Sequence, residues 1–161
     1  DIPQIVYGVN LGITWKQFDL SLLFQGQAKV INTIQETWVD PSSGGAGNLM
    51  QWWTEDMWTP ENTDGTKPRL GTPNKINGTT FTNINAAFFK LKNAEIGYTL
   101  PVAVREKIGV ANARVYLSGT NLFSFDHMRG MGIDPEATGS GYGGWALNPQ
   151  RLINLGVNVS F

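Results

Sequence analysis

The chain has 161 residues, of which only 16% are charged, whereas glycine (19) and tryptophan (6) are abundant for this length. A net charge of −1 argues against an electrostatic nucleic-acid binder, and the absence of cysteine excludes disulfides and thiolate metal sites. No apolar run approaches the roughly 18 residues of a membrane helix, but a barrel strand needs only about 9–11 alternating residues. The composition is compatible with a membrane β-barrel and with a secreted all-β sugar-binding domain.

The first predicted strand covers residues 5–15, where apolar residues alternate strictly with small or polar ones. At about 3.3 Å per residue, a strand of this length crosses a bilayer at the tilt of a barrel. A tight turn at Lys16 and Gln17 leads to a second predicted strand over residues 18–27, and the two form a hairpin.

Alternation fades over residues 28–87, a predicted loop far longer than the roughly 12–15 residues usual in compact domains. A short helix is expected at residues 51–57 because Pro60 would end it. Four of the six tryptophans fall in this loop, which indicates an ordered segment with a small core of its own.

Three of these tryptophans, Trp52, Trp53 and Trp58, are candidates for substrate binding because aromatic faces stack on sugar rings. The alternative is that they hold the loop together or contact a partner protein. We favour this structural interpretation.

Alternation returns in three further predicted strands, at residues 88–100, 112–123 and 151–161. A single helical turn is expected between the first two, stopped at Gly109. The second long loop covers residues 125–150 and is rich in glycine.

The alternation also predicts which side chains face the lumen of a barrel. In the register that places Ile96 toward lipid, Lys90 and Lys92 also lie on the lipid side. Either their ammonium groups snorkel at the outer rim, or a bulge shifts the phase of the alternation in this strand. The lumen-facing side chains are expected to hydrogen-bond one another or a plug, or to touch passing cargo. They are Asn10, Gln25, Glu95, Arg114 and Tyr116.

The lengths of the connections alternate along the chain. Residues 16–18 and 101–110 form short connections, and residues 28–87 and 125–150 form long ones. Bacterial barrels have brief periplasmic turns and long extracellular loops, so the predicted fold is an all-β membrane barrel. Five strands cannot close such a barrel, which needs at least about eight. The chain is therefore expected to be a C-terminal segment of a larger protein.

Several segments together resemble the C-terminal end of SusC/RagA-type TonB-linked outer-membrane transporters of Bacteroidetes, over nearly the whole chain and in the family's order. They are Pro3-Gln-Ile-Val-Tyr-Gly-Val-Asn10, Phe18-Asp-Leu-Ser-Leu-Leu-Phe-Gln-Gly26, Trp58-Thr-Pro-Glu-Asn62, Leu91-Lys-Asn-Ala-Glu-Ile-Gly-Tyr-Thr-Leu-Pro101 and Val115-Tyr-Leu-Ser-Gly-Thr-Asn-Leu-Phe123.

The resemblance implies a barrel of about 22 strands with an N-terminal plug. It also implies a cell outer membrane location in contact with lipid, a SusD-like lipoprotein partner, and energy from the TonB complex through a region outside this chain. The implied activity is import of oligosaccharides or peptides. No cofactor is implied, and no catalytic or metal-binding residue is nominated. Phe161 is expected to be part of the signal that the barrel-assembly machinery recognises. The alternative is a soluble or secreted all-β carbohydrate-binding module, which would have a compact, closed core.

Overall fold

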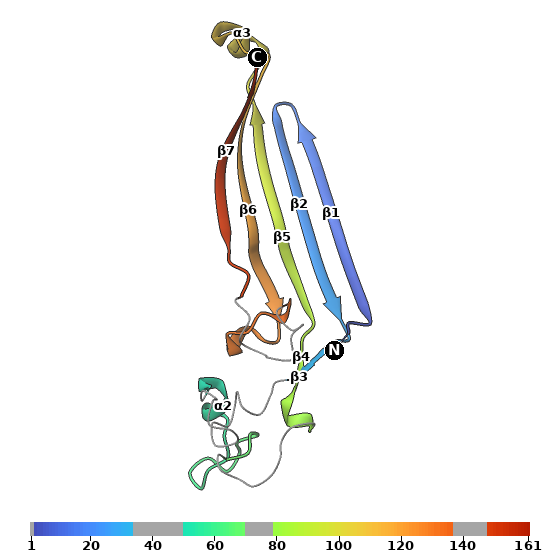
Figure 1. The fold of residues 1–161 in the computed structure, drawn as a ribbon, viewed down its shortest axis with the longest axis vertical. Coiled ribbons are helices and arrows are strands. Elements are labelled where there is room, and N and C mark those ends of the chain that lie inside the picture. Colours follow the sequence, from blue (N-terminus) through green and yellow to red (C-terminus); the bar gives the residue numbers. More distant parts are fainter. Residues whose placement is uncertain (1, 34–49, 70–78, 137–147) are drawn as a thin grey trace. The chain divides into compact units, whose positions relative to one another are not determined.

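A computed structural model describes residues 2–33, 50–69, 79–136 and 148–161 (Figure 1). The chain divides into two compact units. The sheet unit comprises Val6–Gly26, Phe89–Phe125 and Gln150–Phe161. The loop unit comprises Asp1–Ile5, Gln27–Phe88 and Asp126–Pro149.

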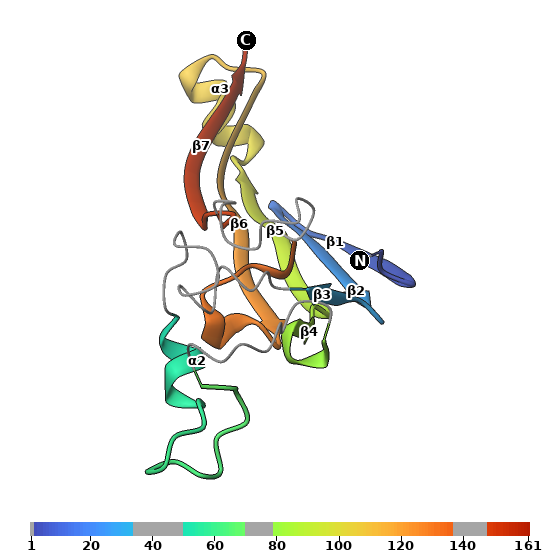
Figure 2. The ribbon, with the colours of Figure 1, turned by 60° about the horizontal axis from the view of Figure 1, so that its bottom comes forward.

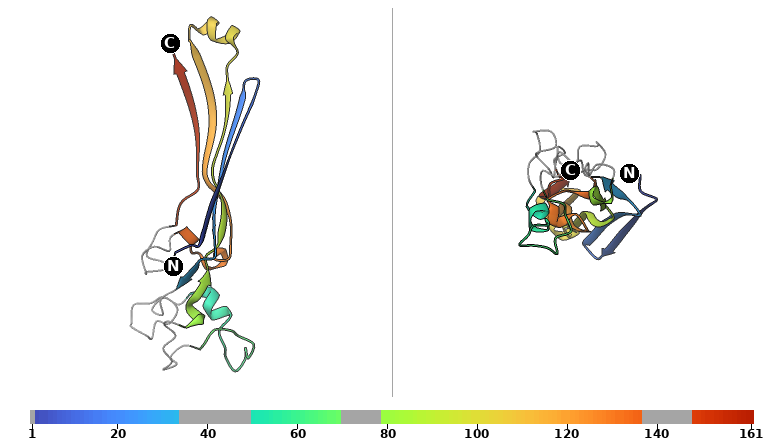
Figure 3. Two further views of the ribbon diagram at one scale, coloured as in Figure 1. Left: turned by 90° about the vertical axis from the view of Figure 1, so that its right-hand side faces the viewer. Right: turned by 90° about the horizontal axis from the view of Figure 1, so that it is seen from below.

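The sheet unit is one five-stranded sheet in the order β1-β2-β5-β6-β7, and neighbouring strands run in opposite directions (Figure 1). The sheet twists along its length (Figure 3). Its observed strands agree with the five predicted strands to within three residues. They are β1 (Ile5–Trp15), β2 (Phe18–Ala28), β5 (Phe88–Thr99), β6 (Asn112–Asp126) and β7 (Leu152–Ser160).

The outermost strands of this sheet expose large apolar side chains. β1 is exposed along its whole length, and β7 is exposed everywhere except at Gly156. Ile153, Leu155 and Val157 of β7 are among these exposed apolar residues. A soluble sandwich would bury this face against a second sheet, so the closed core of the alternative prediction is not what forms here.

The two short connections lie at the same end of the sheet because the strands are antiparallel (Figure 1). One is the two-residue turn at Lys16 and Gln17. The other contains α3 (Val102–Ile108), which ends at Gly109 with a φ of 70°, a left-handed conformation that glycine adopts without strain. The predicted helix and its end at Gly109 are confirmed, although its seven residues make about two turns instead of the single turn expected.

Strand β5 does not keep one phase of alternation. The ring of Phe89 stacks on Phe24 with centroids 5.4 Å apart, and Tyr98 contacts Phe18 at 4.7 Å. Phe18 and Phe24 are an even number of residues apart and share one face of β2. Phe89 and Tyr98 are an odd number of residues apart, so in a regular strand their side chains would point to opposite faces of the sheet. A one-residue change of phase in β5 explains both contacts. Lys90 is only 3% exposed, so of the two alternatives predicted for it the open lipid-facing rim is wrong, and the change of phase is the one that fits.

The loop unit contains short elements that the alternation did not predict. β3 (Ile31–Thr33) and β4 (Asn83–Asn85) pair antiparallel, so residues 28–87 are not one continuous loop (Figure 2). Strands of three residues are too short to show a period of two. The predicted helix at 51–57 is present as α2 (Gln51–Glu55), and 3₁₀ turns occur at Thr80–Thr82 and Arg129–Met131.

This unit has its own small apolar core, as the tryptophan content indicated. Its buried members come from four separate segments of the chain: Val30, Trp53, Ala86, Met128 and Ile133. Across the described parts of both units, no helix is long and apolar enough to span a membrane.

Candidate functional site

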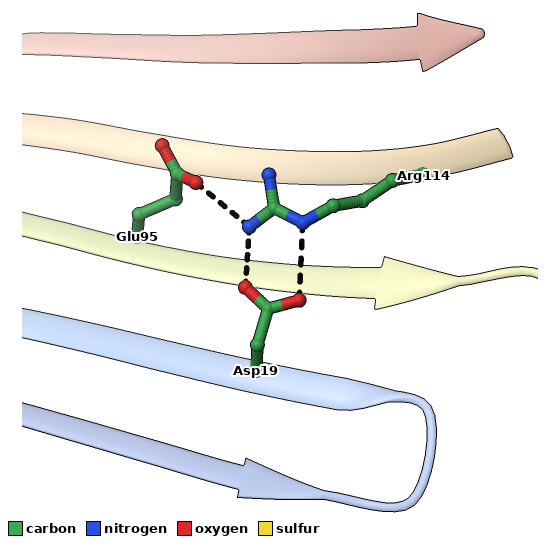
Figure 4. A network of polar contacts seen from close by, with 3 residues as sticks. All are labelled: Asp19, Glu95 and Arg114. Carbon is green, nitrogen blue, oxygen red and sulfur yellow. Dashed lines mark hydrogen bonds and ion pairs between the residues drawn. The ribbon is translucent and has the colours of Figure 1, made fainter. Parts of the chain in front are cut away.

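An ionic network on one face of the sheet joins three neighbouring strands (Figure 4). Arg114 of β6 donates from Nε to Asp19 Oδ1 of β2 at 3.0 Å, and from Nη2 to Glu95 Oε1 of β5 at 2.7 Å. Nη2 also donates to Asp19 Oδ2, so this pair is bidentate. The guanidinium therefore lies across β5 and connects β2 to β6.

Gly97 leaves room for the guanidinium on β5. A Cβ at this position would come within 3.0 Å of the Nη2, Nε and Cζ atoms of Arg114, closer than real Cβ atoms approach a neighbour. A side chain at this position would require the guanidinium to move. Gly97 is therefore part of the site although it has no side chain.

Tyr116 extends the network to β7. Its direct partner in the β6–β7 register is Gly156, and a Cβ there would collide with the phenol ring. The Arg114 guanidinium carbon lies 5.1 Å from the Tyr116 ring centroid, within the range of a cation–π contact. Tyr116 thus lies flat over β7, and the polar surface crosses four adjacent strands.

The network has one cation and two carboxylates, so its formal charge is −1. The side chains of Arg114, Asp19 and Glu95 are 20%, 34% and 38% exposed, so solvent screens their interactions. Among the three residues drawn in Figure 4, Arg114 Nη1 and the second Glu95 oxygen have no partner. The site thus offers a donor beside an acceptor, which suits hydrogen bonding to polar groups.

The structure brings together three of the five predicted lumen-facing residues: Glu95, Arg114 and Tyr116. Asn10 lies exposed on β1 and Gln25 is half-buried on β2, and the described hydrogen bonds join neither to the network. The prediction of site residues missed Asp19, Gly97 and Gly156. Asp19 and Gly97 lie an even number of residues from Gln25 and Glu95, so alternation puts them on the same face, but only the pairing register shows that they meet Arg114.

Aromatic rings gather at two levels on the opposite, apolar face. Trp15, Phe18 and Tyr98 lie near the short connections. Tyr7 and Phe24 flank Phe89 near the other end, with ring centroids 6.3 and 5.4 Å from it. Tyr7 and Trp15 are eight residues apart in β1. At a barrel tilt the two levels are separated by roughly 20 Å along the membrane normal, comparable to the apolar band of outer-membrane barrels.

The three candidate tryptophans of the loop unit occupy different environments. Trp53 is only 2% exposed and lies in the core, so its ring faces are covered. Trp52 packs on that core and meets Trp53 edge-on at 5.6 Å. Trp58 is 41% exposed. Only Trp58 presents a substantial surface to a ligand or partner.

Phe161 follows β7 directly and is almost fully exposed at the end of the sheet with the short connections (Figure 1). Among the described residues, no group of three or more His, Asp or Glu side chains is placed to hold a metal ion.

Comparison with known proteins identifies relatives that match 99% of the chain. TonB-dependent receptor P26 of Formosa agariphila is 30% identical, and TonB-dependent receptor P3 of the same organism is 29% identical. The chain spans 17% and 16% of their lengths. No family model matches.

Solved structures match over the same share of the chain. The RagAB peptide importer in its open-open state has a TM-score of 0.76 and 27% identity, and in its closed-closed state a TM-score of 0.75 and 28% identity. In each case 99% of the chain and 17% of the matched chain are covered.

A sheet with an apolar, aromatic-rimmed face and a polar opposite face defines the wall of a β-barrel in the outer membrane. The chain belongs to the SusC/RagA-type TonB-dependent receptors and corresponds to a C-terminal part of their barrel. The resemblance and the fold class expected from its sequence are therefore confirmed.

Proposed function

We propose that the complete receptor actively imports nutrient molecules across the outer membrane, driven by the TonB complex through a region outside this chain. The observation that carries the proposal is the match of nearly the whole chain to the RagAB peptide importer in two of its states. The division of the sheet into an apolar and a polar face supports it, because an importer needs a polar passage inside a lipid-facing wall.

The proposed partner is a SusD-like surface lipoprotein, and the proposed cargo is an oligosaccharide or a peptide. The segments 28–87 and 125–150 are the proposed extracellular loops that meet the partner. Of the three candidate tryptophans, Trp58 is the one placed for such a contact, because 41% of it is exposed. Trp53 is instead buried in the core of the loop unit.

The polar network has two proposed roles in this mechanism. Arg114 ties β2, β5 and β6 together, which keeps the wall rigid while material moves inside it. The free Arg114 donor and Glu95 acceptor, with Tyr116, Asn10 and Gln25, form the surface that a plug or passing cargo touches. Phe161 is proposed as a part of the assembly signal of the barrel.

An uptake assay tests the proposal. Cells that carry the complete receptor, its deletion, and the deletion complemented with the wild-type gene are given fluorescent peptides or fluorescent oligosaccharides. We expect uptake of one cargo class to fall to background in the deletion strain and to return on complementation. A protonophore should also abolish the uptake, because the energy comes from the inner membrane. Uptake that is unchanged by both the deletion and the protonophore would refute active import.

A further inference from the structure

The turn between β1 and β2 holds a lysine in an unfavourable backbone conformation. Lys16 has a φ of 56°, in the left-handed region where glycine and asparagine are preferred. Two-residue hairpin turns usually place Asn-Gly or Asp-Gly there. A lysine in this position carries conformational strain, and such strain is concentrated at functional sites.

The Lys16 ammonium lies on the lipid-facing side of the sheet. Its Nζ lies 4.8 Å from the centroid of the exposed Trp15 ring. Phe18 faces the same side because its ring contacts Tyr98, whereas the adjacent Asp19 points to the polar side and binds Arg114. The cation thus lies over the Trp15 ring, on the side of the sheet that also carries the rings of Phe18 and Tyr98.

Within the described part of the chain no carboxylate forms an ion pair with this cation, whose Nζ lies over the Trp15 ring. The other connection at this end, α3, carries Arg105 and Lys107 against one carboxylate, Glu106. This rim of the wall is therefore cationic. Because short connections of outer-membrane barrels lie on the periplasmic side, the rim meets the inner leaflet.

We propose that Lys16, Trp15 and Tyr98 form a binding site for the headgroup of an inner-leaflet phospholipid. The ammonium binds the phosphate, the Tyr98 hydroxyl supplies a second donor, and the Trp15 indole lies at the level of the glycerol and upper acyl chain. A phospholipid offers a phosphate to the ammonium and an acyl chain to the aromatic rings, whereas free phosphate can bind only the ammonium.

The test uses the purified full-length receptor in detergent, titrated with phosphatidylglycerol, and native mass spectrometry to count bound lipid. The key variant is Lys16→Asn, because asparagine accepts a positive φ and preserves the turn. Lys29→Asn is the matched control: Lys29 also has a positive φ, 52°, but lies at the opposite end of β2. Far-ultraviolet circular dichroism verifies that both variants fold.

We expect Lys16→Asn to weaken binding of the tightest lipid about fivefold, as for loss of one lysine near an anionic lipid surface. Lys29→Asn should bind as the wild type does. Wild-type affinity in Lys16→Asn would overturn the proposal, as would equal weakening in Lys29→Asn. Displacement of the lipid by equimolar inorganic phosphate would identify a phosphate site instead. Equally tight binding of diacylglycerol, which lacks the phosphate, would show that the cation is not used.

Discussion

Replacing Gly97 by alanine tests whether the polar network depends on a bare strand beneath the guanidinium. The new Cβ would collide with the Arg114 head group and displace it from Asp19 and Glu95. Three charge-assisted hydrogen bonds are then lost or lengthened. Such bonds contribute about 1.5–3 kcal/mol each when buried, but partial exposure reduces this to roughly 0.2–1 kcal/mol. We therefore expect Gly97→Ala to lower the free energy of unfolding of the complete receptor by about 2 kcal/mol.

A double-mutant cycle makes this prediction specific. In an Arg114→Ala background the guanidinium is gone, so Gly97→Ala should cost nothing and should stabilise the strand by about 0.5 kcal/mol. Gly12→Ala is the matched control, because Gly12 is a strand glycine with nothing within 4 Å of an added Cβ. The measurement is urea unfolding of the complete receptor followed by tryptophan fluorescence. An equal cost of Gly97→Ala in both backgrounds would refute the inferred contact with Arg114.

Three further predictions concern other contacts. Gly156→Ala should displace the Tyr116 ring and lower the free energy of unfolding by about 1–2 kcal/mol, because it weakens the β6–β7 pair. Urea unfolding measures this change, and unchanged stability would contradict the placement of the ring. Trp53→Ala should empty the core of the loop unit at a cost of about 3–5 kcal/mol and make the loops protease-sensitive, whereas Trp58→Ala should leave protease resistance unchanged. Hydrogen bonds from the Thr66 hydroxyl and backbone N–H, with Lys67 nearby, hold the pKa of Asp56 below its ordinary value of 3.8. The ionised form of Asp56 therefore stabilises the loop above pH 3.8. Protection of the loop against an acid-active protease should fall as the pH drops below this value. An Asp56→Asn variant that keeps the wild-type pH profile would exclude this role.

The polar site shows where prediction from the sequence reached its limit. Alternation placed Glu95, Arg114 and Tyr116 on one face, since side chains of a strand point to opposite faces in turn. It could not show that the Arg114 side chain reaches back over Gly97 to Asp19, because that depends on the register between strands far apart in the chain. Alternation offered a change of phase in β5 as one of two explanations for Lys90 and Lys92, but only the ring contacts across β2 and β5 decided between them.

The sequence by itself determined the five long strands, the end of the sheet at which each connection lies, and the family to which the chain belongs. These features follow from local rules: a period of two, turn residues such as Gly109, and a set of motifs in a fixed order. Only the tertiary structure decided which tryptophans are buried, since Trp53 is covered by residues from distant segments of the loop unit. It also decided that Gly97 and Gly156 belong to the site, because a strand glycine matters only where a neighbouring side chain fills the space above it, as Arg114 and Tyr116 do here.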